Sequence, residues 1–373
     1  GEYEVTFTLQ RPQAPFLKNL AMPPFAIASP AALQKYGDKF NENPVGTGPF
    51  KFVEWRRNDR IVIEKFADYW DPKYPILDRV TFVSIPDNSA RLNALLAGDV
   101  DLIDGINYSD VPTIEADSDL KIFSRPSMNV GYVGLTVTRG PMQDKRVRQA
   151  LNHAVNKEEI IQAFYEGYAI PAKNPMPPVI SGYNDNIVDY EFDLEKAKQL
   201  LAEAGYPDGF EMELWAMPVP RPYMPDGQKV AEAIKANFEK IGVKAKIVSM
   251  EWGTYLERTA AGDADAFMLG WTGDNGDPDN FLYVLLDKDN IGTNNYTYYS
   301  NDELHEILIE AQSTPDEDKR AELYKRAQEI IKEDAPWIPL VHSQPLLAGR
   351  KDIVNFLPHP TGSDLLHKVD FQK

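Results

Sequence analysis

The sequence predicts an α/β fold with a parallel sheet and two similarly built lobes. Residues 210–271 alternate strand and helix patterns, and one short helix ending occurs twice in the chain. Strands that alternate with helices are usually joined by right-handed crossovers in a parallel sheet. With 373 residues, 43% of them hydrophobic, the chain is long enough for two globular domains.

The stretch from 210 to 271 carries a strand-helix-strand-helix-strand pattern. Residues 210–217, 243–250 and 266–271 are predicted strands, and a short helix bearing Trp252 precedes the last of them. A longer helix between the first two strands ends at Gly242. Its apolar face carries Val230, Ala231, Ile234, Phe238 and Ile241.

The repeated helix ending supports two lobes. Residues 97–101 and 261–265 share the pattern Ala-Gly-Asp-x-Asp, and each follows a predicted helix and precedes an apolar strand. Gly98 and Gly262 are expected to adopt the left-handed conformation that ends a helix. The same helix-to-strand turn in two places predicts two α/β lobes of similar construction.

Three further elements are expected. Residues 3–9 alternate apolar and polar side chains, which predicts a half-buried strand. Ser300 with Glu303, and Thr314 with Glu317, have the spacing of capping boxes at the start of two amphipathic helices.

Composition excludes several functions. The formal net charge of −18 disfavours nucleic acid and anionic membrane surfaces as partners. Cysteine is absent, so disulfides and thiolate metal sites are excluded. The sequence contains no phosphate-binding loop, nucleophile elbow or zinc-protease motif, and its five histidines are widely spread. We therefore expect no cofactor, no resident metal and no catalytic residues.

Two charged residues are the leading site candidates. Arg221 follows the predicted strand 210–217, and Asp274 follows the predicted strand 266–271. The carboxyl ends of neighbouring parallel strands meet at one edge of a sheet, where α/β proteins bind ligands. A cation and an anion at that edge suit a small ligand that carries both charges, such as a short peptide.

The acidic loop itself allows other interpretations. Asp274, Asp277 and Asp279 lack the residue order of a calcium loop. A hydrolase normally draws its two carboxylates from separate strands rather than from one turn. A solvated turn with Asx hydrogen bonds is favoured for Asp277 and Asp279, but not for Asp274.

Aromatic residues lie close to these loops in the sequence. Tyr223 stands in a proline-braced loop beside Arg221 and is the aromatic residue best placed to face a ligand. Trp252 and Trp271 have packing within the sheet and helices as their more usual role. With Gly273, they complete the candidate ligand-binding set.

The chain resembles the dipeptide-binding branch of the peptide and nickel family of ABC-transporter solute-binding proteins. The Arg-Pro-Tyr loop at 221–223 and the run Trp-Thr-Gly-Asp-Asn-Gly-Asp-Pro-Asp-Asn at 271–280 are specific to that branch. The resemblance runs essentially from end to end. Other segments that carry it are 11–17, 43–50, 129–132, 147–151, 183–185 and 251–256.

The resemblance implies roles for these residues. Arg221 would bind the terminal carboxylate of a dipeptide and Asp274 its α-ammonium group. The protein would be a monomeric, non-enzymatic receptor, either periplasmic or lipid-anchored outside the membrane. It would deliver dipeptides to the permease of an ABC importer.

The fold implied is the two-lobed periplasmic binding protein type of the large peptide-binding class (type II), with a hinge between the lobes. Residues 1–126 would form the remainder of the first lobe, 127–344 the second lobe, and 345–373 a return to the first. The family's N-terminal quarter, before the position of Gly1, is expected to be missing. That leaves two alternatives, a fragment or a protein whose N-terminal part is a separate chain.

Two alternative functions stay open. Relatives of such a receptor share a fold but not a ligand, so a longer peptide, haem or a metal chelate is a second interpretation. A ligand without both charged termini would have no use for Arg221 together with Asp274. A secreted hydrolase would need a second positioned carboxylate or a nucleophile, which the sequence does not supply.

Overall fold

A computed structural model describes residues 1–372. Internal contacts divide the chain into two compact units, of which the larger holds residues 1–19 and 127–343 and the smaller holds 20–126 and 344–373. The first nineteen residues therefore group with the larger unit, and the lobe boundaries expected from the sequence stay a prediction. No helix in residues 1–372 is both long and apolar enough to cross a membrane.

The larger unit is built on a six-stranded mixed sheet in the order β7-β11-β6-β10-β8-β9. Its strands are β6 (Asn129–Leu135), β7 (Ala169–Pro171), β8 (Glu211–Trp215), β9 (Lys244–Val248), β10 (Ala266–Thr272) and β11 (Trp337–Ser343). Strand β8 pairs in parallel with both β9 and β10, whereas β6 runs antiparallel to β10 and β11. The predicted parallel arrangement is thus confirmed for β9, β8 and β10.

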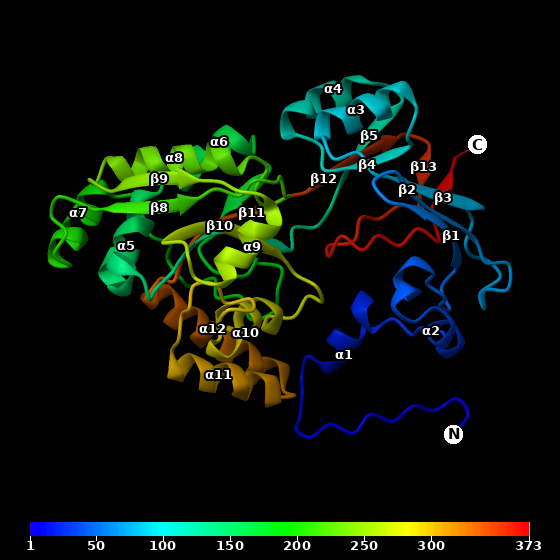
Figure 1. The fold of residues 1–373 in the computed structure, drawn as a ribbon, viewed down its shortest axis with the longest axis horizontal. Coiled ribbons are helices and arrows are strands. Elements are labelled where there is room, and N and C mark those ends of the chain that lie inside the picture. The colour runs from blue at the N-terminus through cyan, green and yellow to red at the C-terminus, as the bar shows by residue number, and fades with distance from the viewer. Residues whose placement is uncertain (373) are drawn as a thin grey trace. The chain divides into compact units, whose positions relative to one another are not determined.

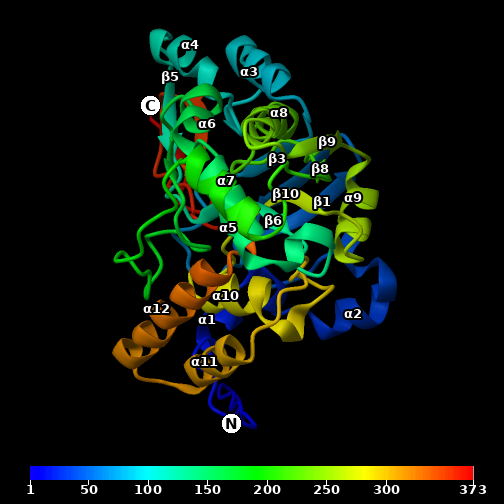
Figure 2. The ribbon, with the colours of Figure 1, turned by 90° about the vertical axis from the view of Figure 1, so that its left-hand side faces the viewer.

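The larger unit also contains helices, most of which flank the sheet (Figures 1 and 2). They are α1 (Phe16–Leu20), α5 (Lys145–Ala154), α6 (Lys157–Phe164), α7 (Leu194–Glu203), α8 (Gly227–Glu239), α9 (Trp252–Ala260), α10 (Asp279–Leu286), α11 (Asp302–Ser313) and α12 (Glu317–Asp334), with short 3₁₀ turns η4 (Gly140–Gln143) and η5 (Lys288–Asn290). Helix α1 ends one residue inside the smaller unit. The predicted apolar face of α8 is buried, and Gly242 follows the helix with a φ of 83°.

The order of the parallel strands creates a switch point. Strand β8 lies between β9 and β10, so the connections β8-α8-β9 and β9-α9-β10 run in opposite directions across the sheet. Right-handed crossovers in opposite directions place their helices on opposite faces. Figure 1 shows α8 on one side of β8 and β9, and α10 to α12 grouped on the other. The carboxyl ends of β8 and β10 therefore flank the position where such sheets bind ligands.

Within its described residues, the smaller unit holds two three-stranded sheets and one two-stranded sheet. Their strands are β1 (Phe50–Arg56), β2 (Arg60–Lys65) and β3 (Arg79–Val83); β4 (Leu102–Asp104), β12 (Leu346–Arg350) and β5 (Leu120–Ser124); and β13 (Ile353–Val354) with β14 (Asp370–Phe371). The helices are η1 (Pro23–Phe25), α2 (Pro30–Tyr36), η2 (Gly37–Glu42), α3 (Asn88–Ala97), η3 (Tyr108–Asp110) and α4 (Val111–Ala116). Strand β12 comes from the C-terminal segment and pairs with β4 and β5, which ties that segment into this unit.

The repeated helix ending is present in both units. Gly98 ends α3 before β4 with a φ of 77°, and Gly262 follows α9 before β10 with a φ of 75°. Residues with another side chain rarely adopt these values, so glycine allows each turn into the sheet. The left-handed glycine expected after each helix is thus confirmed at both positions, whereas the similar construction of the two lobes stays a prediction.

Two local expectations were wrong. Residues 3–9 are exposed and form no strand, because no described strand pairs with them and an alternating pattern alone does not supply a partner. The caps of α11 and α12 are Asn301 and Asp316 rather than Ser300 and Thr314. Asn and Asp are at least as favourable at this position, and both accept a hydrogen bond from a backbone N–H of the first turn.

Candidate ligand-binding site

Two loops leave the switch point of the larger unit. Residues 216–226 connect β8 to α8, and residues 273–278 connect β10 to α10. In the first loop, Arg221 and Met224 exchange backbone N–H···O hydrogen bonds of 3.0 and 2.9 Å. These bonds close a tight turn that fixes the backbone at Arg221.

Tyr223 fixes this turn against the sheet. Its ring lies on Gly270 of β10, where an added Cβ would come within 2.2 Å of a ring carbon. Its carbonyl oxygen lies against Gly131, which pairs with Gly270 across β6 and β10, and accepts a 2.8 Å hydrogen bond from the Tyr165 hydroxyl. The two glycines therefore provide the space that brings the Arg221 turn beside the C-terminal half of β10.

The burial of Tyr223 bears on its expected role. The side chain is only 8% exposed, and burial raises the pKa of its hydroxyl, against the effect of the Arg221 guanidinium. Its main contribution in the structure is to seat the loop. Contact between Tyr223 and a ligand stays a prediction.

Arg221 is half-buried and lies against an aromatic stack. Its guanidinium carbon is 5.2 Å from the centre of the Trp252 ring, which in turn stacks on Tyr255 at 5.7 Å. Nη1 donates a 3.0 Å hydrogen bond to the carbonyl oxygen of Pro220. No carboxylate among residues 1–372 forms an ion pair with Arg221. Because guanidinium groups bind carboxylates through paired N–H donors, this group is suited to an anionic ligand.

Asp274 is half-buried and is held by Asn280. The Asp274 backbone N–H donates to Asn280 Oδ1 at 2.9 Å, and Asp274 Oδ2 accepts from Asn280 Nδ2 at 2.9 Å. The Trp271 indole Nε1–H donates to the same Asn280 Oδ1 at 3.0 Å. Within the described chain, no lysine, arginine or histidine pairs with Asp274.

The expected Asx hydrogen bond is present, because Asp277 Oδ1 accepts from the Asp279 backbone N–H at 3.0 Å, but the expectation that Asp277 and Asp279 are solvated was wrong. The Asp277 side chain is fully buried, and Arg320 of α12 donates to both of its oxygens at 2.6 and 2.8 Å. Burial acts to raise the pKa of Asp277, but Arg320 outweighs it and lowers that pKa. Asp279 accepts from Gln312 of α11 at 2.9 Å, and burial raises its pKa to about 6. The helices after the turn cover it, which a local pattern does not reveal.

Gly273 also has a packing role. Its backbone N–H donates to the Met128 carbonyl oxygen at 2.8 Å, and an added Cβ would come within 2.8 Å of the Phe281 ring. Ligand contact by Gly273 stays a prediction, as it does for Trp252 and Trp271. Asn280 was missed because an amide at the end of an acidic motif carries no charge to single it out.

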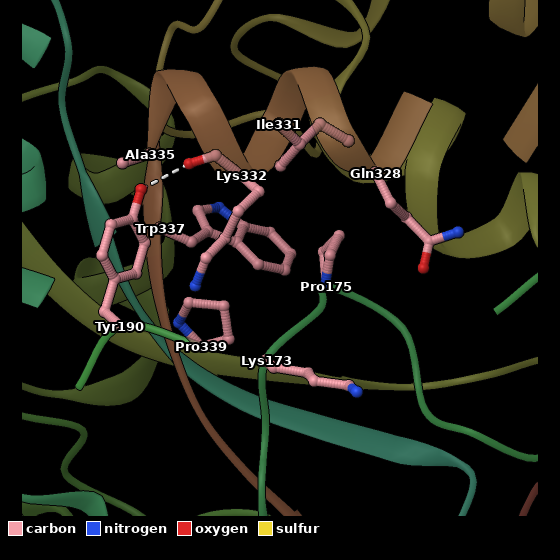
Figure 3. Close-up of a pocket in the computed structure, with 9 residues that line it drawn as sticks. All are labelled: Lys173, Pro175, Tyr190, Gln328, Ile331, Lys332, Ala335, Trp337 and Pro339. Atoms are coloured by element: carbon pink, nitrogen blue, oxygen red, sulfur yellow. Dashed lines mark hydrogen bonds between the residues drawn. The ribbon is translucent and has the colours of Figure 1, made fainter. Parts of the chain in front are cut away.

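Two other features of the larger unit lie apart from the candidate residues. A pocket of about 10 Å³, shown in Figure 3, has room for about one water molecule and none for a peptide. It is lined by Lys173, Pro175, Tyr190, Gln328, Ile331, Lys332, Ala335, Trp337 and Pro339. Among the described residues, Asp287, Asp289 and His305 form a group of the metal-ligating type, in which His305 Nδ1 is 3.0 Å from both Asp287 oxygens.

Comparison with known proteins identifies the class. The profile described as bacterial extracellular solute-binding proteins, family 5 Middle, matches residues 1–293. The chain belongs to this family, which confirms the resemblance and the two-lobed α/β fold inferred from the sequence.

Relatives within the family have several ligands. The chain is 40% identical over 374 residues to the dipeptide-binding protein of Escherichia coli K12, which covers 99% of this chain and 70% of that relative. It is also 40% identical to heme-binding protein A of Haemophilus influenzae, over 98% of this chain and 68% of the relative. Among solved structures it is similar to the ABC transporter-associated periplasmic binding protein DppA from Helicobacter pylori in complex with the peptide STSA. That match has a TM-score of 0.89 and 37% identity, over 98% of this chain and 72% of the other.

Proposed function

We propose that this protein captures dipeptides by their two charged termini and delivers them to an ABC importer without chemical turnover. In this proposal it acts outside the cytoplasmic membrane, free in the periplasm or held by a lipid anchor, and as a monomer that meets a permease. The dipeptide-binding relative of Escherichia coli K12 at 40% identity, and a similar structure at 31% identity of a dipeptide binding protein in complex with Met-Leu, support this choice.

The observation that carries the proposal is that two half-buried charged side chains have no ionic partner in the described part of the protein. Arg221 and Asp274 are half-buried at the switch point of one sheet, and neither has an ionic partner among the described residues. The neighbouring acid Asp277, by contrast, is paired with Arg320 and lies 3.4 Å from Lys18. Removing charges from water without compensation is unfavourable, so the two free charges indicate a ligand that supplies both counter-charges.

A dipeptide supplies them in the right form. A planar guanidinium binds a carboxylate through two N–H donors, and an aspartate accepts from an ammonium group. The termini of an extended dipeptide are about 7 Å apart, so a fixed pair of charges selects for ligand length. Such recognition leaves the side chains of the peptide free to vary.

The alternatives fit these charges less well. Haem carries two carboxylates and no ammonium, so Asp274 would face it without a counter-charge. A tetrapeptide is a zwitterion, but its extended termini are about 14 Å apart, which separates it from a dipeptide by length alone. A relative of known structure at 29% identity binds agropinic acid, which shows that the family admits other small ligands.

Calorimetric titration with dipeptides tests the proposal. Arg221→Ala and Asp274→Ala should each weaken binding by about 2–5 kcal/mol, because the ligand charge is then buried without its partner. Glu257→Ala is the matched control, because Glu257 is an exposed carboxylate on α9 and is expected to leave binding unchanged.

Chemically blocked peptides assign each residue to one terminus. Acetylation of the peptide N terminus should weaken wild-type binding strongly and add little loss in Asp274→Ala. Amidation of the C terminus should behave in the same way with Arg221→Ala. If the penalties of mutation and blocking are instead additive, these side chains do not contact the peptide termini and the proposal fails.

A further inference from the structure

Asn280 occupies a junction between two candidate ligand residues. Its side chain lies in the first turn of α10 and is largely buried, with 7% of the residue exposed. Oδ1 accepts from the Trp271 indole and from the Asp274 backbone, while Nδ2 donates to Asp274 Oδ2. One amide therefore links an aromatic ring, a backbone N–H and a carboxylate.

Chemistry permits only this orientation of the amide. An indole Nε1–H and a backbone N–H can only donate, so the group between them must be an acceptor. The ionised Asp274 carboxylate can only accept, so the group facing Oδ2 must be a donor. Asparagine combines both within one short side chain, whereas an aspartate at this position would set two carboxylates against each other.

We propose that Asn280 is the positioning residue for ammonium recognition, fixing the Asp274 carboxylate and the Trp271 ring as one unit. The inference rests on the proposed dipeptide function, because it assigns a role within that same site. Asn280 engages Asp274 Oδ2, while Oδ1 accepts no hydrogen bond from any other residue in the described chain. The amide thereby leaves Oδ1 for the ligand ammonium group.

Replacement of the amide by a carboxyl group gives a test with a distinctive pH profile. At about pH 7.5, Asn280→Asp should bind a dipeptide at least about tenfold more weakly, because a donor to Asp274 has become a repelling charge. As the pH falls towards about 5, a proton shared by the facing carboxyls restores the donor, so affinity relative to wild type should rise. Asn280→Leu removes the amide altogether and should show the loss without the recovery.

Two controls separate positioning from general damage. Asn237→Asp makes the same change at a comparably buried residue, 4% exposed, on α8 and should leave both affinity and its pH profile at the wild-type level. With an N-acetylated dipeptide, the acetylation penalty should be large in wild type, small in Asn280→Asp at about pH 7.5, and larger again near pH 5.

A readout without ligand keeps the inference separate from the proposed function. The Trp271 contribution to near-ultraviolet circular dichroism, identified by Trp271→Phe, should persist in Asn280→Asp, whose carboxylate still accepts from the indole. It should be lost in Asn280→Leu. Wild-type protein that binds no dipeptide would refute the proposed function. Equal affinity of Asn280→Asp and wild type, an equal loss at both pH values, or an unchanged Trp271 signal in Asn280→Leu would overturn the role of Asn280.

Discussion

Replacing Asp279 with asparagine should stabilise the protein, and the gain should depend on pH. Burial raises the pKa of Asp279 to about 6, although Gln312 donates a hydrogen bond to its Oδ1. The amide oxygen of asparagine accepts the same hydrogen bond without carrying a charge. Asp279→Asn therefore removes a buried charge while it keeps the contact with α11.

The magnitude follows from the difference between folded and unfolded pKa values. An unfolded aspartate titrates near about 3.9, so a folded pKa of about 6 costs about 3 kcal/mol when both states are ionised. For an acid with a raised pKa, this cost is complete above about pH 6 and declines as the pH falls, because the folded state takes up the proton first. The cost should fall to about 1.5 kcal/mol at pH 5 and to about 0.5 kcal/mol at pH 4.

Urea unfolding of wild type and Asp279→Asn at about pH 7.5 and pH 5 measures this difference. The stabilisation should shrink by about 1.5 kcal/mol between the two conditions. Asp277→Asn is the contrasting control in the same turn. The lowered pKa of Asp277 contributes stability that is lost only below the ordinary aspartate pKa, so this variant should be destabilised about equally at both pH values. A stability change in Asp279→Asn that is the same at both pH values would refute the reasoning.

Two further predictions concern the sheet and the absence of chemistry. The buried Tyr255 hydroxyl accepts a hydrogen bond from the Met268 N–H at 3.1 Å and lies 3.0 Å from the Trp215 carbonyl oxygen, so it bridges β8 and β10. Tyr255→Phe should therefore lower the free energy of unfolding, measured in urea, by about 1–3 kcal/mol. An unchanged unfolding midpoint would show that this bridge is dispensable. Incubation with a dipeptide library should return every peptide intact by chromatography, because no nucleophile–base pair accompanies the candidate site. Cleavage lost in Asp277→Asn would contradict the receptor function.

The sequence predicted the elements that depend on local periodicity. The helix with Val230 and Phe238 on its apolar face, and the strands on either side of it, were recognisable because each buries one continuous face. The relation between the Arg221 and Asp274 loops followed from the topology of parallel strands alone. These features require no knowledge of distant contacts.

Features that depend on distant contacts could not be predicted in this way. Arg320 lies 43 residues from its partner Asp277 in the sequence, and no local sequence pattern around either residue predicts this ion pair. Residues 3–9 show the opposite error, because their alternation satisfies a strand pattern while no described strand pairs with them. Both cases depend on a partner that is distant in the sequence, an ion-pair partner in the first and a neighbouring strand in the second. Which partners meet is a property of the whole fold.

The turn after β10 combines two electrostatic roles within six residues. Asp277 is neutralised from within the protein by Arg320, and its Oδ1 also accepts the Asp279 backbone N–H at 3.0 Å, so it fixes the turn. Among residues 1–372, Asp274 is held by the neutral amide of Asn280 alone, so its charge is positioned without being neutralised. A cation at Asp274 like that at Asp277 would compete with a ligand ammonium group, whereas an amide leaves the charge available. In the proposed site, the neutral partner of Asp274 would therefore allow a rigid turn to serve as the receptor for the ligand ammonium group.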